Sequence, residues 1–110
     1  MFIAITATED PETVCMYMEG SLNAASQQAF ESKFQEATQR AQMILIDFSA
    51  IEQIDSVGLG ALIRCFHNGL AAQVRLVLMH LQFQPRSVIE LTKIEQVFEV
   101  LSPKYLSGRL

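Results

Sequence analysis

Short apolar runs separated by polar residues dominate the first part of the chain. One apolar stretch begins at Phe2 and stops at the Asp10-Pro11 turn, and a second runs from Val14 to Met18. Two such runs on either side of a turn are typical of a β-hairpin. The segment Gly20-Ser21-Leu22-Asn23 is expected to break the second strand.

Three later segments carry apolar residues at helical spacing. The first predicts a helix with one apolar stripe, capped by Asn23 or Ser26. Its stripe consists of Ala29, Phe30, Phe34, Ala37 and Ala41. The second predicts a helix that ends near Gly69 and buries five large side chains, which are Leu59, Leu62, Ile63, Phe66 and Leu70. The third predicts a helix that begins at Pro85 and carries the apolar residues Val88, Ile89 and Leu91.

Further strands are predicted between these helices. Residues 43–48 form a continuous apolar run, which is typical of a central strand buried on both faces, and a connector with Ile51 and Ile54 follows it. The last two predicted strands are residues 74–79 and 97–101. In the tail, residues 102–110, Ser102-Pro103 can start one helical turn. The order ββαβαβαβ predicts an α/β fold: a mixed sheet with parallel, right-handed crossovers and helices on at least one face.

Composition and charge narrow the class of protein. The chain has 110 residues, half of them apolar, which predicts a single globular domain over residues 1–110. Its net charge of -4 disfavours nucleic acid as a partner. Nine acids and two bases put -7 on residues 1–60, whereas three acids and six bases put +3 on residues 61–110. No signal peptide or membrane-length apolar run is present, so a cytoplasmic location is expected.

The pattern of reactive side chains argues against catalysis. Cys15 and Cys65 lie in apolar segments and are predicted to be reduced core thiols, and no Cys/His spacing suits a metal. The methionines of the strands are predicted to fill the core. His67 lies eleven residues beyond Ser56 on the same predicted helix, about 16 Å away, and His80 is interpreted as a loop residue. No cofactor is expected, and the protein is predicted not to be an enzyme.

The segment Asp55-Ser56-Val57-Gly58-Leu59-Gly60 is the one unusual stretch. An acid and a hydroxyl stand where a connector enters a helix, so Asp55 or Ser56 can be a simple N-cap, and the glycines allow close packing. Alternatively, a hydroxyl at a helix N-terminus lies where free N–H groups and the helix dipole favour a phosphoryl group. A phosphate there would add negative charge beside Asp55 and could act as a switch.

These residues resemble the STAS domain, specifically the small bacterial anti-sigma factor antagonists. Gly20-Ser21-Leu22-Asn23 is similar to the family's Gly-x-Leu/Ile-Asp, with Asn23 in place of the usual Asp. Residues 45–49 look like the family's third strand, and Asp55–Gly60 is similar to its Asp-Ser-x-Gly-Leu-Gly signature. The resemblance implies a four- to five-stranded sheet with helices packed mainly on one side.

The resemblance also implies a function in partner switching. Such a protein binds an anti-sigma factor that is also an ATP-dependent serine kinase, and this binding releases a sigma factor. The kinase phosphorylates the serine that matches Ser56, and a phosphatase restores it. The residues implied in partner binding are Asn23, Asp55, Ser56, Val57, Gly58 and Leu59. The alternatives are a STAS subunit of an ABC-type lipid or solute transporter and a scaffold STAS domain of a stress-sensing assembly.

Overall fold

The computed structural model describes residues 1–91 and 99–101. Its elements follow the predicted order ββαβαβαβ. They are β1 (Phe2–Ala7), β2 (Thr13–Leu22), α1 (Gln27–Thr38), β3 (Met43–Ile54), α2 (Ser56–Ala71), β4 (Arg75–Met79), α3 (Phe83–Leu91) and β5 (Glu99–Leu101). The positions 97–98 of the last predicted strand and the predicted turn at Ser102-Pro103 lie outside the described residues.

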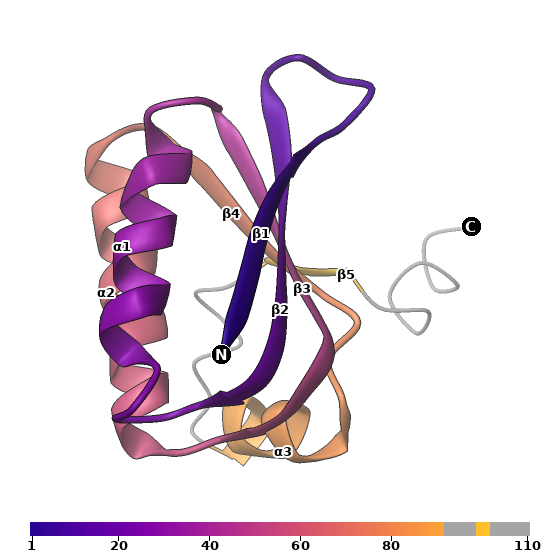
Figure 1. Ribbon diagram of the computed structural model, residues 1–110, viewed down its shortest axis with the longest axis vertical. Coiled ribbons are helices and arrows are strands. Elements are labelled where there is room, and N and C mark those ends of the chain that lie inside the picture. Colours follow the sequence, from indigo (N-terminus) through magenta and orange to yellow (C-terminus); the bar gives the residue numbers. More distant parts are fainter. Residues whose placement is uncertain (92–98, 102–110) are drawn as a thin grey trace.

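The strands form one five-stranded mixed sheet in the order β1-β2-β3-β4-β5. The β1–β2 hairpin is antiparallel, and the pairs β2–β3, β3–β4 and β4–β5 are parallel. Helices α1 and α2 lie side by side along one face, and α3 lies at the end of the sheet where β3 terminates (Figure 1). The predicted fold class and the central position of β3 are therefore confirmed.

The core lies between the sheet and the pair α1 and α2. On β3, Ile44, Ile46 and Phe48 are fully buried, whereas the intervening Met43, Leu45 and Asp47 are only partly buried. This alternation corrects the expectation of a strand buried on both faces, because α1 and α2 cover one face of the sheet. Among the described residues, no helix is long and apolar enough to cross a membrane.

The buried stripes of the helices differ from those expected. On α2 the fully covered positions are mostly small, namely Gly58, Ala61, Leu62, Cys65 and Gly69. The predicted stripe is confirmed at Leu62. Leu59, Ile63 and Phe66 pack against the core but are only partly buried, and the prediction is wrong at Leu70, which is 60% exposed. Small residues face the sheet because they let the helix backbone approach it closely. On α1, Ala29 is exposed, and Ala41 lies beyond the end of the helix.

Two strands and one helix have different limits from those predicted. β2 continues through Gly20 to Leu22, where a break was expected, and β3 continues through Ile51 to Ile54, where a connector was expected. Gly20 has a φ of 121°, and the β2–β3 register shifts on either side of it, so irregular pairing lets both strands continue. α3 begins at Phe83, two residues before Pro85, and Leu91 is 82% exposed.

The predicted core thiols and methionines occupy two different environments. Cys65 is buried, and burial raises the pKa of its thiol to about 12. Cys15 is free but only partly buried, on the sheet face away from α1 and α2, and burial again raises its thiol pKa. Met16 and Met18 are fully buried, whereas Met43 and Met79 are only partly buried. Raised thiol pKa values disfavour the nucleophilic thiolate form.

His80 follows β4 and has a hydrogen-bonding partner on the neighbouring strand. Its Nδ1 lies 3.1 Å from Oδ1 of Asp47. Burial acts to raise the pKa of Asp47, but hydrogen bonds from Ser49 and His80 outweigh it and lower the pKa. The interpretation of His80 as a satisfied loop residue is therefore confirmed.

Candidate functional site

The two motifs meet where β2 and β3 end together. Leu22 and Ile54 are the last partners in the β2–β3 register, and the N–H of Asp55 donates to the carbonyl oxygen of Leu22 at 3.2 Å. Because the strands are parallel, their carboxyl ends lie at the same edge of the sheet. Asn23 and Asp55, which are far apart in the sequence, therefore leave neighbouring strand ends.

Asp55 is the N-cap of α2. Its backbone is extended, and Oδ1 accepts a hydrogen bond from the N–H of Gly58 at 2.9 Å. Of the two residues that were candidates for this role, the structure selects Asp55. Ser56 is the first residue of the helix, and its side chain is exposed to solvent. The hydroxyl of Ser56 is therefore available for another role.

Gly58 is the point of closest approach between α2 and the end of β2. A Cβ atom built on Gly58 would overlap the carbonyl oxygen of Leu22 and lie 2.6 Å from its carbonyl carbon. That oxygen also accepts the hydrogen bond from Asp55, so the β2 backbone cannot move away freely. The absence of a side chain at Gly58 thus sets how deeply the start of α2 sits against the sheet.

Asn23 forms a compact turn before α1. Its Oδ1 accepts from the N–H groups of Ala25 at 3.0 Å and Ser26 at 3.2 Å. The hydroxyl of Ser26 donates to the carbonyl of Ser21 at 2.7 Å, so Ser26 is the N-cap residue without a side-chain cap bond. An aspartate could accept the same two bonds, so Asn23 preserves the turn and differs from Asp only in charge.

Gln84 of α3 supports the site from the other side, and the sequence analysis did not identify it. The last pair of β3 and β4 is Asp47 and Met79, so the end of β3 extends beyond β4. There the amide of Gln84 takes the place of a strand: Oε1 accepts from the N–H of Ile54 at 2.8 Å, and Nε2 donates to its carbonyl at 3.1 Å. No local pattern marks a glutamine for this role, because its partner is thirty residues away.

Replacement of Gln84 by leucine is expected to lower the free energy of unfolding by about 2 kcal/mol, because a partly buried N–H and C=O of Ile54 would both lose their partner. Gln82→Leu is the matched control. Gln82 is exposed and donates one bond, to the carbonyl of His80, so its loss should change stability by less than about 0.5 kcal/mol. Denaturant titration measures both variants, and equal stabilities would contradict the supporting role of Gln84.

The predicted contact residues divide into an exposed and a covered group. Asp55, Ser56 and Val57 are exposed, and Asn23 is partly exposed; we call these four residues the Ser56 surface. Gly58 is buried and Leu59 is partly buried against the core. The structure therefore brings all six predicted residues together but gives Gly58 and Leu59 a packing position.

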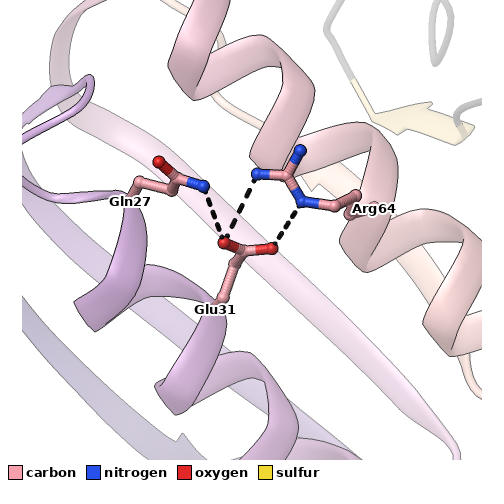
Figure 2. A network of polar contacts seen from close by, with 3 residues as sticks. All are labelled: Gln27, Glu31 and Arg64. Carbon is pink, nitrogen blue, oxygen red and sulfur yellow. Dashed lines mark hydrogen bonds and ion pairs between the residues drawn. The ribbon is translucent and has the colours of Figure 1, made fainter.

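A polar network joins α1 to α2 on the outer side of the helix pair (Figure 2). Arg64 donates to both carboxylate oxygens of Glu31, at 2.9 and 3.4 Å, and Gln27 donates to Glu31 at 3.2 Å. The hydrogen bond from Arg64 lowers the pKa of Glu31. Because the Arg64 side chain is half exposed, solvent screens this ion pair, and its contribution to stability is small.

No group of three or more His, Cys, Asp or Glu side chains within residues 1–91 and 99–101 is arranged to hold a metal ion. The group of the Ser56 surface that can be modified is the Ser56 hydroxyl at the start of α2.

Comparison with known proteins identifies relatives by family model and by fold. The model of the STAS domain matches residues 4–105. No curated protein matches the chain by sequence. Among solved structures, an anti-sigma factor antagonist from Mycobacterium paratuberculosis is 18% identical with a TM-score of 0.76, and the match covers 97% of this chain and 93% of that one.

Two further structures share the fold. SpoIIAA, a cell fate determinant of Bacillus, in its phosphorylated form is 17% identical with a TM-score of 0.68, and the match covers 98% of both chains. The mouse anion transporter Slc26a9 is 17% identical with a TM-score of 0.73, over 86% of this chain but only 17% of the transporter. At these identities the likeness establishes the fold.

Proposed function

The chain belongs to the STAS domain family, and from this membership and the geometry at Ser56 we propose that it is an anti-sigma factor antagonist. In this proposal it binds an anti-sigma factor that is also an ATP-dependent serine kinase, and binding releases a sigma factor. Phosphorylation of Ser56 switches the binding off, and a phosphatase restores it. Similarity in fold to antagonists, including a phosphorylated one, supports the class of function.

The observation that carries the proposal is the exposed position of Ser56 at the first residue of α2. The first N–H groups of a helix lack partners within the helix and favour an anionic group. Asp55 already caps Gly58, so modification of Ser56 would remove no hydrogen bond that holds the helix start. A phosphoryl group could therefore be added without unfolding the site.

Charge explains how the modification would act as a switch. A phosphoserine carries about -1.5 to -2 charges near neutral pH. It would stand beside Asp55, in the half of the chain that sums to -7. The partner surface would contact an uncharged hydroxyl in the unmodified protein. Placing the negative charge of the phosphate in the same desolvated contact would cost free energy and weaken binding.

Incubation of the chain with ATP and the proposed serine kinase is expected to add one phosphate, on Ser56. Intact-mass spectrometry measures the addition, and peptide mapping locates it. Ser56→Ala should abolish it, whereas Ser49→Ala, which removes another exposed serine, should not. Phosphate on a residue other than Ser56, or none, would contradict the proposal.

The transporter alternative is a STAS subunit that docks on a transport ATPase without phosphorylation. The fold likeness to part of Slc26a9 favours it as the second candidate. Binding that does not change between Ser56→Ala and Ser56→Asp would favour this alternative or a scaffold role. In each case we propose a cytoplasmic binding module with no catalytic turnover.

A further inference from the structure

Phe83 is an aromatic side chain left in solvent. It is the first residue of α3, and it is 86% exposed. Large apolar side chains in this position give up the stabilisation that burial would provide. Nothing in the packing of α3 requires an aromatic residue there, because the buried side chains of that helix are Pro85 and Ile89.

The backbone that carries Phe83 is held in place on several sides. The next residue, Gln84, makes two hydrogen bonds to Ile54, and Pro85 is buried. The hydroxyl of Ser87 donates to the carbonyl of Phe83 at 2.9 Å. An exposed aromatic residue on a fixed backbone loses little conformational entropy when it enters a binding pocket.

Phe83 lies at the same end of the molecule as the Ser56 surface. Figure 1 shows α3 and the start of α2 at the same end of the molecule, and the Gln84 side chain is hydrogen-bonded to Ile54, two positions before Ser56. Two residues of extended chain span about 7 Å. A standard interface covers about 800 Å² on each partner, a patch about 30 Å across, which is wide enough to include both Ser56 and the start of α3.

The surroundings of Phe83 indicate the chemistry of its partner. Val57, at the start of α2, is a second exposed apolar side chain at this end, 40% exposed. Glu52 and Asp55, which precede α2 in the chain, are exposed acids, and Arg86 of α3 is a partly buried base. This mixture fits a partner surface with an apolar pocket next to basic side chains.

We propose that Phe83 is the apolar anchor of the Ser56 surface and inserts into an apolar pocket of the ATP-binding serine kinase. The inference rests on the proposed function, since it names a further contact residue for the same partner. The proposal also gives a role to the two hydrogen bonds between Gln84 and Ile54, because they keep Phe83 at a constant distance from Ser56.

Site-specific photocrosslinking in the native cell tests the inference. The photoreactive residue p-benzoyl-phenylalanine is placed at position 57, at position 83 or, as a control, at position 70, where Leu70 is 60% exposed near the far end of α2. We expect positions 57 and 83 to crosslink to the same ATP-binding protein, identified by mass spectrometry, and position 70 to give no such product. A crosslink from 57 without one from 83 would overturn the inference and leave the proposed function standing. No crosslink to an ATP-binding protein from either position would overturn both.

Binding of the purified kinase gives a second, independent measurement. Phe83→Ala should weaken its affinity at least about tenfold, and Leu70→Ala should leave it within about twofold of the original chain. Because Phe83 is exposed, Phe83→Ala should melt at the same temperature as the original chain, which separates lost contact from lost fold. Equal affinities of Phe83→Ala and the original chain would overturn the inference.

Discussion

Replacement of Gly58 by alanine is expected to destabilise the fold by about 3 kcal/mol or more. In an exposed helix the same change stabilises by about 1 kcal/mol, because alanine favours the helix. Here the added methyl group would overlap the backbone carbonyl of Leu22, which is held by strand pairing and by the N–H of Asp55. Overpacking against backbone that cannot move away reverses the sign. The melting temperature should fall by at least about 10 °C.

Gly60→Ala provides the matched control on the same helix. A Cβ on Gly60 would lie 3.5 Å from the flexible end of Arg64, an ordinary contact. We therefore expect Gly60→Ala to be neutral or to raise stability by up to about 1 kcal/mol. Thermal and denaturant unfolding of the two variants measures the difference. If Gly58→Ala proved as stable as Gly60→Ala, the conclusion that Gly58 lies too close to the Leu22 backbone for a side chain would be wrong.

Ser56→Asp is expected to weaken binding of the kinase by about tenfold or more. The change adds a carboxylate beside Asp55 at an exposed position of the proposed contact. The partner surface is complementary to an uncharged hydroxyl, so burying a carboxylate there should reduce the binding free energy by about 2 kcal/mol. The fold should not suffer, since an acid in the first turn of a helix is neutral or mildly favourable.

Two uncharged variants separate charge from shape. Ser56→Ala removes the hydroxyl, and Ser56→Asn has nearly the size of aspartate without its charge, so both should retain affinity within about threefold of the original. Calorimetric titration against the kinase measures all three variants, with melting curves alongside. Equal affinities of the Asp and Asn variants would show that charge at this position does not control binding.

The order of strands and helices and the central motif could be predicted because the information is local. The run at residues 43–48 identified the central strand, and the pair Asp55-Ser56 in front of an apolar stripe identified the start of α2. The buried stripe of α2 could not be predicted from size and hydrophobicity alone. How closely a helix approaches a sheet decides whether Leu59 or Gly58 faces it, and that distance depends on the tertiary packing.

The ends of the strands and the role of Gln84 depend on partners far away in the sequence. Gly20 is typical of a turn, yet pairing with β3 carries β2 past it to Leu22. Gln84 is one of several glutamines in the chain, and only the extension of β3 beyond β4 gives it backbone groups to bind. Residues of this kind are found from the structure, because their partners are not neighbours in the chain.

The Ser56 surface and the proposed anchor Phe83 together would form a discontinuous binding site. The end of β2, the start of α2 and the start of α3 come from three parts of the chain about thirty residues apart, joined through the backbone of Leu22 and Ile54. A short peptide copied from any one part would lack the other two, so a partner that recognises the assembled surface discriminates folded from unfolded chains. Binding and folding are then thermodynamically linked, and a saturating partner would protect the chain against unfolding and proteolysis.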